Sequence, residues 1–276
     1  MDPLTASILI VAALLHASWH ALVKAGDDQL VNLVGMGLVA AIPTAAAIPF
    51  LPLPPPDTIP ILVSSIVLHG AYKICIAYAY ARADLAQAFP LARGCVPVFA
   101  TVLAFAALGQ VPTMGESVGT LLIALGIISL AVDKRAAHPS AIAAAVGAGL
   151  AVAGYSVLDA YGTRVYGNWA GFTAWLVFSD SAVFLAFGCA IRGRRIWPSL
   201  IRMRARVAVS GLLGIIAFAA FLWAISQSPA GASAALRETS ILFAMLIGAL
   251  INRERLGFRR ALSGALILAG IASITL

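Results

Sequence analysis

The chain has 276 residues, of which 62% are hydrophobic and only 11% are charged, with a net charge of +7. Soluble domains carry roughly 45–50% apolar and about 25% charged residues, so this composition excludes a soluble globular protein and predicts an integral membrane protein. The excess positive charge lies mostly in short connecting segments. That placement is typical of loops that fix membrane orientation and does not indicate nucleic-acid binding.

Apolar runs separated by helix breakers predict an all-α membrane protein with about ten transmembrane helices, because roughly 20 apolar residues cross the hydrocarbon layer as a helix. Proline-rich and turn-rich segments interrupt the runs, since proline cannot continue a helix. The expected spans are residues 4–23, 30–50, 60–81, 85–108, 115–132, 140–161, 169–191, 206–227, 231–251 and 258–276.

The two halves of the chain resemble each other. When the sequence is shifted by 144 positions, Arg93 falls on Arg237 and Gly126 falls on Gly270. Paired arginines inside an apolar sequence are the informative match, because small residues coincide easily in such a composition. The spacing of Gly264 and Gly270 is typical of close helix packing in membranes.

This similarity predicts two five-helix repeats, residues 1–136 and 137–276, with the polar stretch near residue 136 as the seam. A five-helix unit that is repeated once is inserted in the opposite orientation the second time. Many secondary transporters have this plan, with the binding site near the midplane between the repeats. The basic residues cluster after the odd-numbered helices, so the positive-inside rule places both termini outside.

Ionisable side chains inside the spans are the candidate functional residues, because each costs about 2.5–3.5 kcal/mol at the bilayer centre. His16 and His20 are four residues apart in the first helix, and His69 and Lys73 have the same spacing in the third. His20, Lys73 and Asp159 are deep enough to line a cavity, whereas His16 is expected to pack within the protein.

Other intramembrane charges favour structural roles or leave two interpretations open. Asp180 lies in the middle of a span and is expected to pair with a basic residue on another helix. Arg93 or Arg237 could be an interfacial anchor, but their matched positions favour a shared role. Glu238 is offset by about 100° from Arg237 on a helix and need not face the same cavity.

Metal binding and catalysis are not indicated. The HASWH sequence has two histidines at zinc-site spacing but lacks the glutamate that serves as general base in zinc proteases. No phosphate-binding loop or nucleophile motif occurs, and the three cysteines lie singly inside apolar segments. We therefore expect no metal, no cofactor and no enzymatic activity.

The stretches HASWHALVKAG (16–26), AYARADLAQAFPLARG (79–94) and ALRETSILFAMLIGALINRERLGFRRALSGALILAGI (235–271) are similar to EamA-type members of the drug/metabolite transporter superfamily. The resemblance covers essentially the whole chain. It implies transport without naming the cargo, through a cavity formed by helices 1, 3, 4, 6, 8 and 9. The substrate-binding residues that it implies are Trp19, His20, Tyr72, Lys73, Arg93, Tyr155, Asp159 and Arg237.

The first helix departs from one group of relatives. Small multidrug-resistance proteins bind cations and protons with a glutamate in their first helix, and no carboxylate occurs inside this one. Basic groups also outnumber carboxylates among the deep candidates, and arginine can hold a carboxylate or phosphoryl group with two hydrogen bonds. We therefore expect a small anionic or zwitterionic metabolite, such as an amino acid, a carboxylate or a phosphonate-like compound.

The expected mechanism is alternating access across the inner membrane, with export as the expected direction. His20, His69 and Asp159 are the candidates for proton coupling. The expected partners are the small-molecule substrate and the lipid bilayer, with no nucleic acid, and the protein is a monomer or a homodimer. The alternative is a flippase or scramblase of an anionic lipid or lipid-linked precursor, whose headgroup the basic segment 192–207 would bind.

Overall fold

The computed structural model describes residues 3–108, 113–131, 138–227, 237–250 and 257–275, and within these ranges the chain forms helices and no strands. The predicted all-helical fold is therefore confirmed, whereas the expected seam near residue 136 lies outside the described residues. The long helices are α1 (Pro3–Lys24), α2 (Gln29–Ala47), α3 (Ile59–Tyr80), α4 (Leu85–Leu108), α5 (Met114–Ala131), α6 (Pro139–Tyr166), α7 (Trp169–Arg192), α9 (Arg204–Gln227), α11 (Ser240–Leu250) and α12 (Phe258–Thr275).

Short elements connect two pairs of long helices. The 3-10 turns η1 (Ile48–Phe50) and η2 (Pro56–Thr58) bracket the proline-rich segment between α2 and α3. Between α7 and α9, the turn η3 (Gly193–Arg195) leads into the seven-residue helix α8 (Ile196–Arg202). The sequence predicted only a loop between α7 and α9.

Local side-chain bonds fix where the helices begin and end. Asp28 caps α2 by accepting a hydrogen bond from the backbone N–H of Val31 at 3.1 Å, and Asn168 caps α7 through Gly171 N–H at 3.0 Å. Helix α6 ends at Gly167, whose φ of 74° is a left-handed conformation that glycine adopts without strain. Gly167 and Asn168 therefore reverse the chain between α6 and α7.

The helix faces that point away from the bundle are apolar. Ile42, Val67, Leu121 and Val157 are all more than half exposed although they lie within helices. Such a continuous apolar exterior fits contact with lipid rather than water. Among the described residues, six segments are long and apolar enough to cross a membrane: Pro3–Lys24, Gln29–Phe50, Pro56–Tyr80, Pro139–Tyr166, Trp169–Arg202 and Arg204–Ala224. Shorter apolar helices occur at Ser117–Gly126, Ser240–Leu250 and Ala261–Ser273.

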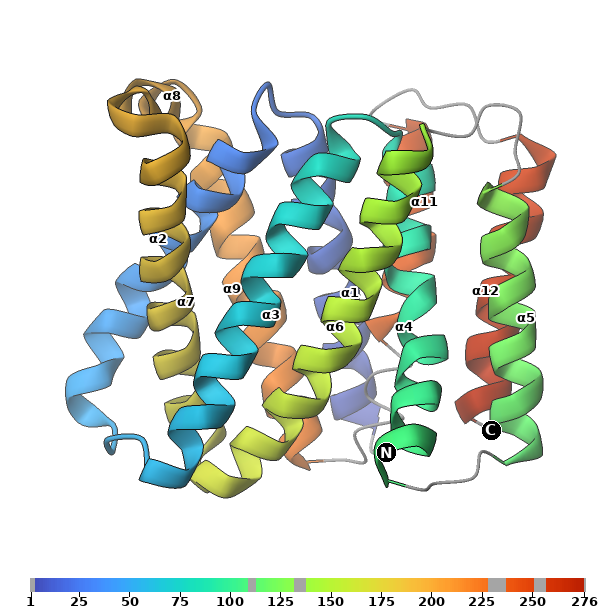
Figure 1. Cartoon of the computed structure of the whole chain (residues 1–276), viewed down its shortest axis with the longest axis horizontal. Coiled ribbons are helices and arrows are strands. Elements are labelled where there is room, and N and C mark those ends of the chain that lie inside the picture. Colours follow the sequence, from blue (N-terminus) through green and yellow to red (C-terminus); the bar gives the residue numbers. More distant parts are fainter. Residues whose placement is uncertain (1–2, 109–112, 132–137, 228–236, 251–256, 276) are drawn as a thin grey trace.

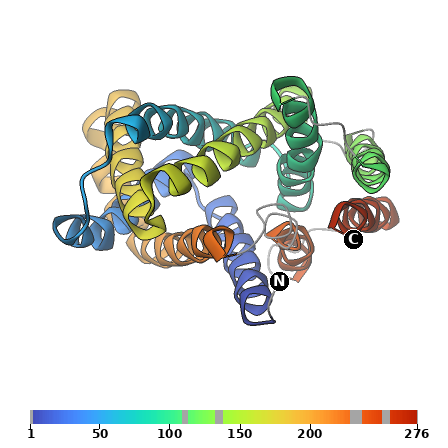
Figure 2. The same cartoon turned by 90° about the horizontal axis from the view of Figure 1, so that it is seen from below.

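The helices form a main bundle with one outer pair. In the bundle α3 packs along α6, α1 along α9, and α2 along α7, while α4 contacts α6 and α11 contacts α1. Helices α5 and α12 pack on each other beside the main bundle, at the right in Figure 1 and again in Figure 2. Their backbones approach closely at Gly126 and Gly270, as the small-residue spacing predicts.

The two ends of the bundle differ in charge. Both chain termini lie at the lower end in Figure 1, and α8 lies at the upper end. The upper end includes Arg192 at the end of α7, Arg194 and Arg195 in η3, Arg202 in α8 and Arg204 at the start of α9. One end of the protein is therefore strongly basic, and it is the end opposite the termini.

Candidate functional site

A cavity of about 130 Å³ lies between helices from the two halves of the chain. Since one water occupies roughly 10–15 Å³ of such space, this volume is sufficient for a small solute. Its wall is mostly apolar and aromatic, with a few ionisable groups, which is the usual composition of a ligand site. The lining residues come from α1, α2, α3, α6, α7 and α9, and among them are His16, Trp19, Met36, Ala40, His69, Tyr72, Lys73, Tyr155, Asp180, Ser181, Gly214 and Phe218.

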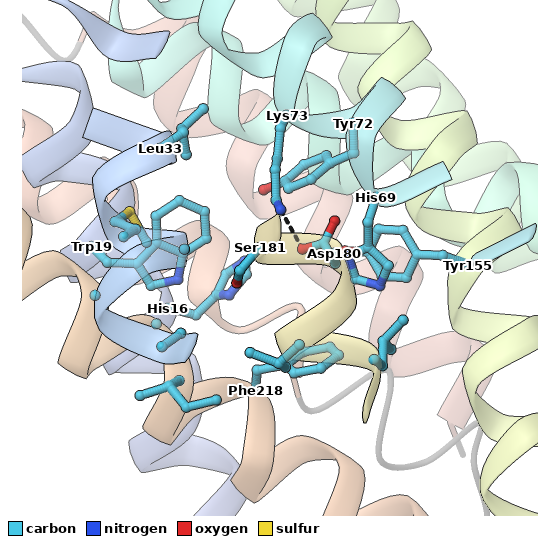
Figure 3. Close-up of a pocket in the computed structure, with 18 residues that line it drawn as sticks. His16, Trp19, Leu33, His69, Tyr72, Lys73, Tyr155, Asp180, Ser181 and Phe218 are labelled. Atoms are coloured by element: carbon cyan, nitrogen blue, oxygen red, sulfur yellow. Dashed lines mark hydrogen bonds and ion pairs between the residues drawn. The ribbon is translucent and has the colours of Figure 1, made fainter. Parts of the chain in front are cut away.

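Aromatic rings face the cavity from two sides. Trp19 and His16 lie on one side and Tyr155 and His69 on the other, with Phe218 below them in Figure 3. The rings of His69 and Tyr155 are stacked with their centroids 3.9 Å apart. Flat aromatic walls of this kind can pack against the apolar part of a ligand.

An ion pair lies between these aromatic sides. The Lys73 ammonium on α3 donates a hydrogen bond to Oδ2 of Asp180 on α7 (Figure 3). Both side chains are largely buried, and the ammonium also lies 4.7 Å from the centre of the Phe184 ring. This confirms the expectation that Asp180 pairs with a basic residue on another helix, and it joins α3 to α7 across the cavity.

A second carboxylate lies behind the cavity wall. Asp159 on α6 is buried, and it accepts a hydrogen bond from Ser65 Oγ at 2.5 Å. Its other oxygen, Oδ2, lies 3.2 Å from Nε2 of His69. Asp159 thus binds two residues of α3, and its link to the cavity runs through His69.

His20 lies at the centre of a buried hydrogen-bonded group next to the cavity. Its Nδ1 lies 2.6 Å from the Tyr80 hydroxyl, and its Nε2 lies 3.0 Å from the Tyr72 hydroxyl and 3.2 Å from Nε2 of His16. The Trp19 ring stacks on His20 with centroids 3.5 Å apart. His20 is therefore fully buried and orients the cavity residues Trp19 and Tyr72 from behind.

The two arginines that the repeat pairs do come together. Arg93 of α4 donates from Nε to Oε2 of Glu238 at 3.1 Å and from Nη2 to Oε1. Arg237 lies with its Nε 4.0 Å from Oε1 of the same glutamate, stacks 3.7 Å over the Phe221 ring and donates from Nη2 to Ser156 Oγ at 3.4 Å. All three charged side chains are buried, and we call them the arginine cluster (Arg93, Arg237 and Glu238).

The charges in the arginine cluster do not cancel. Two guanidinium groups face one carboxylate, so one positive charge is left over. Within the part of the chain that the structure describes, Nη1 of Arg93 and Nε of Arg237 are buried without a hydrogen-bond partner, although buried donors are normally paired. The cluster therefore has both net charge and free donors.

The predicted site residues fall into two sets. Trp19, Tyr72, Lys73 and Tyr155 line the cavity, whereas His20, Arg93, Asp159 and Arg237 are buried next to it and are not part of its described lining. Tyr155 lies between the sets, because its ring stacks on His69, which contacts Asp159. Ser156, the next residue of α6, bonds Arg237 directly.

Sequence reasoning missed several features of this site. His16 was expected only to pack, but it is in the cavity wall. Helices α2 and α7 supply walls that the family resemblance did not imply, whereas α4 contributes to the neighbouring arginine cluster instead. Ser65 was not considered, and only its spacing of four residues from His69 could have indicated that it shares the face of His69.

The described residues were also compared with the arrangement that a metal ion needs. Among the described residues, no group of three or more His, Cys, Asp or Glu side chains is arranged to hold a metal ion. The histidines near the cavity bind tyrosines, a carboxylate or each other instead.

Comparison with known proteins identifies the family. The EamA-like transporter family matches residues 139–276, which is half of the chain. A solved structure described as "Crystal structure of protein" superposes with a TM-score of 0.64 at 17% identity and covers 99% of this chain and 95% of its own, so the two share a fold. No curated protein gives a significant match. The chain belongs to the EamA-like transporter family within the drug/metabolite transporter superfamily, and it is a membrane transporter of that type.

Proposed function

We propose that this protein is a secondary transporter that moves a small anionic or zwitterionic metabolite by alternating access through the cavity. The substrate enters between the two halves and contacts Trp19, Tyr72, Lys73 and Tyr155. Rocking of one half against the other then switches the cavity between the two sides of the membrane.

The arginine cluster is the observation that carries the choice of an anionic group. A buried positive charge with free N–H donors is costly unless a negative group binds there at some stage of the cycle. A substrate carboxylate or phosphoryl oxygen supplies both the charge and the acceptors for Arg93 Nη1 and Arg237 Nε. We expect the substrate to reach the cluster beside Tyr155 of the cavity wall, because the next residue of α6, Ser156, bonds Arg237.

The cavity itself favours a substrate that also has a positive or polar group. Lys73 and Asp180 cancel each other, so the cavity offers one partner for each sign of charge. A zwitterion can bind both without leaving an unpaired charge, and its apolar part fits the aromatic walls. A purely cationic drug lacks a partner for the arginine cluster.

Helix packing supports the proposal of ten spans in two inverted repeats. The contact of α3 with α6 has a counterpart in α9 with α1, and that of α4 with α6 has one in α11 with α1. At the outer pair, Gly126 meets Ile267 and Ser263, and Gly270 meets Ile123 and Gly119. A shift of 144 residues converts one set of contacts into the other, which is expected for a pseudo-two-fold axis.

The charge asymmetry of the bundle supports an orientation. With the basic end at α8 in the cytoplasm, the positive-inside rule places both termini outside, in a multi-pass arrangement in the inner membrane. The same orientation directs the proposed export from the α8 end to the end with the termini.

Uptake into proteoliposomes tests the substrate class. Purified protein is screened with radiolabelled carboxylates, phosphonates, amino acids and cationic drugs, and with a fluorescent anionic lipid for the flippase alternative. Arg237→Met is expected to lower transport about tenfold or more, because a tenfold loss corresponds to about 1.4 kcal/mol and a charged hydrogen bond contributes about 1.5–3 kcal/mol. Arg237→Lys keeps the positive charge but loses the planar guanidinium group that can donate two hydrogen bonds to one carboxylate. This variant should retain intermediate activity.

Arg204→Met is the matched control, since Arg204 is exposed at the start of α9. It removes the same charge away from the cluster and should transport like the wild type. Movement of cations without anions or zwitterions would overturn the substrate class. Full activity of Arg237→Met would overturn the site.

A further inference from the structure

We propose that Asp159 and His69 share one exchangeable proton, and that this proton is the coupling ion of the transport cycle. The shared proton is a property of the protein without substrate. Its role as the coupling ion rests on the proposed function as a transporter.

The two buried carboxylates near the cavity differ in their partners. Asp180 is held by the ammonium group of Lys73. Asp159 is paired with an imidazole at 3.2 Å and a hydroxyl at 2.5 Å, and neither carries a fixed charge. The Asp159–His69 pair therefore places a carboxylate and an imidazole where they can hold one proton between them, whereas Asp180 is bonded to an ammonium group.

Position gives the proton a route to the cavity. The side chain of Asp159 is 1% exposed, while that of His69 is 11% exposed and is part of the cavity wall. His69 is held between the stacked Tyr155 ring and Phe218, whose ring centroid is 5.6 Å away. A proton that leaves Asp159 thus passes to Nε2 of His69, and from the ring of His69 it can reach water in the cavity.

The charged groups around the pair are bonded to other partners, so they do not neutralise Asp159 in place of the proton. On α3 and α7, Lys73 and Asp180 neutralise each other. In the arginine cluster, Arg93 bonds Glu238 and Arg237 bonds Ser156, so neither guanidinium group is bonded to Asp159. Tyr155 and Tyr72 are neutral phenols, the α2 residues in the cavity wall are uncharged, and Asp57 in η2 is exposed.

Cavity hydration then determines whether the pair holds the proton. When the pair has lost its proton, Asp159 is a buried anion next to a neutral imidazole. A buried anion of this kind is unfavourable while the cavity is closed and dry. When the cavity opens, water solvates the charge and the proton can leave. Proton binding therefore depends on the same opening that exposes the substrate.

Infrared spectroscopy tests the shared proton without any substrate. Beside the signals of the exposed carboxyl groups, the pH-difference spectrum of purified wild-type protein should contain one signal from the pair, as either a protonated carboxyl group or an imidazolium, because a coupled pair titrates as a unit. Asp159→Asn and His69→Gln should each remove or replace that signal, and Ser65→Ala should shift it. Asp57→Asn, which removes an exposed carboxyl group outside the cavity, is the control and should leave the signal of the pair in place.

Proton coupling is then measured with the radiolabelled carboxylate or amino acid that the wild-type protein exchanges most rapidly. A pH gradient should drive wild-type accumulation above equilibrium. Asp159→Asn should accumulate the probe only to the equilibrium level, whatever its rate of exchange, whereas Asp57→Asn, which changes an exposed carboxylate outside the cavity, should still respond to the gradient.

The outcomes separate the two proposals. If Asp159→Asn and His69→Gln leave the infrared signal unchanged, or if Asp159→Asn still accumulates the probe against its gradient, the shared-proton proposal is overturned. If no anion or zwitterion is moved by the wild-type protein, the proposed function fails. The infrared measurement still decides the shared proton in that case.

Discussion

Arg93 and Glu238 are 145 positions apart in the chain, yet they form a bidentate ion pair with side-chain exposures of only 1% and 2%. The pair connects α4 with the turn that precedes α11. Because Arg237 lies beside it, Glu238 is the one carboxylate among the described residues that compensates both buried arginines. The energy of the arginine cluster therefore depends strongly on this residue.

Glu238→Gln should lower the free energy of unfolding by about 3–5 kcal/mol, because it leaves buried guanidinium groups without their counter-charge. Unfolding in a denaturing detergent measures the change. Arg192→Met is the control, since the Arg192–Asp28 pair is partly exposed and worth at most about 1 kcal/mol. If Glu238→Gln is as mild as the control, the cluster is not energetically coupled in this way.

Ala40→Phe should block transport by filling the cavity, because Ala40 is buried on α2 and its side chain lines the wall. The phenyl ring occupies space that the substrate needs, so the uptake rate should fall about tenfold or more, which corresponds to about 1.4 kcal/mol or more. Initial uptake rates in proteoliposomes measure the effect. Ala45→Phe, at an exposed position on the same helix, should remain active. Equal loss in both variants would indicate general damage to α2 instead.

Gly270→Ala should separate α5 from α12. A Cβ at this position would lie 2.6 Å from the carbonyl oxygen of Gly119 and 2.7 Å from Ile123, and the backbone atom cannot rotate away. We expect a loss of about 1–3 kcal/mol in unfolding free energy. Gly70→Ala on α3 is the control, because nothing lies within 4 Å of its added methyl group. Gly70→Ala should be neutral or stabilising by up to about 1 kcal/mol, from helix propensity alone.

The fold class was predictable because lipid imposes it. Apolar runs of about 20 residues must be helical, since the backbone finds no other hydrogen-bond partners in hydrocarbon. Helices α1, α3 and α7 therefore begin and end close to the predicted residues. Helix α8 was missed because Arg194, Arg195 and Arg202 made its segment look like a loop, although a short surface helix accommodates such residues equally well.

The partners of the charged residues were not predictable to the same degree. Periodicity shows which residues share a face of one helix, as His69 and Lys73 do on α3, but it does not show which helix lies opposite. Glu238 was set apart from Arg237 by its angle on a regular helix, yet it lies in a turn before α11 and turns toward Arg93. His16 packs against Trp19 and His20 as expected, but its place in the cavity wall was not predictable, since the open space beside it depends on α2, α7 and α9.

The proline-rich segment between α2 and α3 is fastened to two other helices through one carbonyl group. Pro52 O accepts hydrogen bonds from the hydroxyl of Tyr166 at the end of α6 and from the indole N–H of Trp175 on α7, the latter at 3.2 Å. Tyr166→Phe removes one donor and should cost about 0.5–1.5 kcal/mol, and addition of Trp175→Phe should cost more because the carbonyl then loses both partners. Hydrogen exchange and protease cleavage at residues 51–57 should accelerate in that order. Tyr161→Phe, an exposed tyrosine of the same helix, should change neither rate. Unchanged exchange in the double variant would mean that the proline residues alone hold the segment in place.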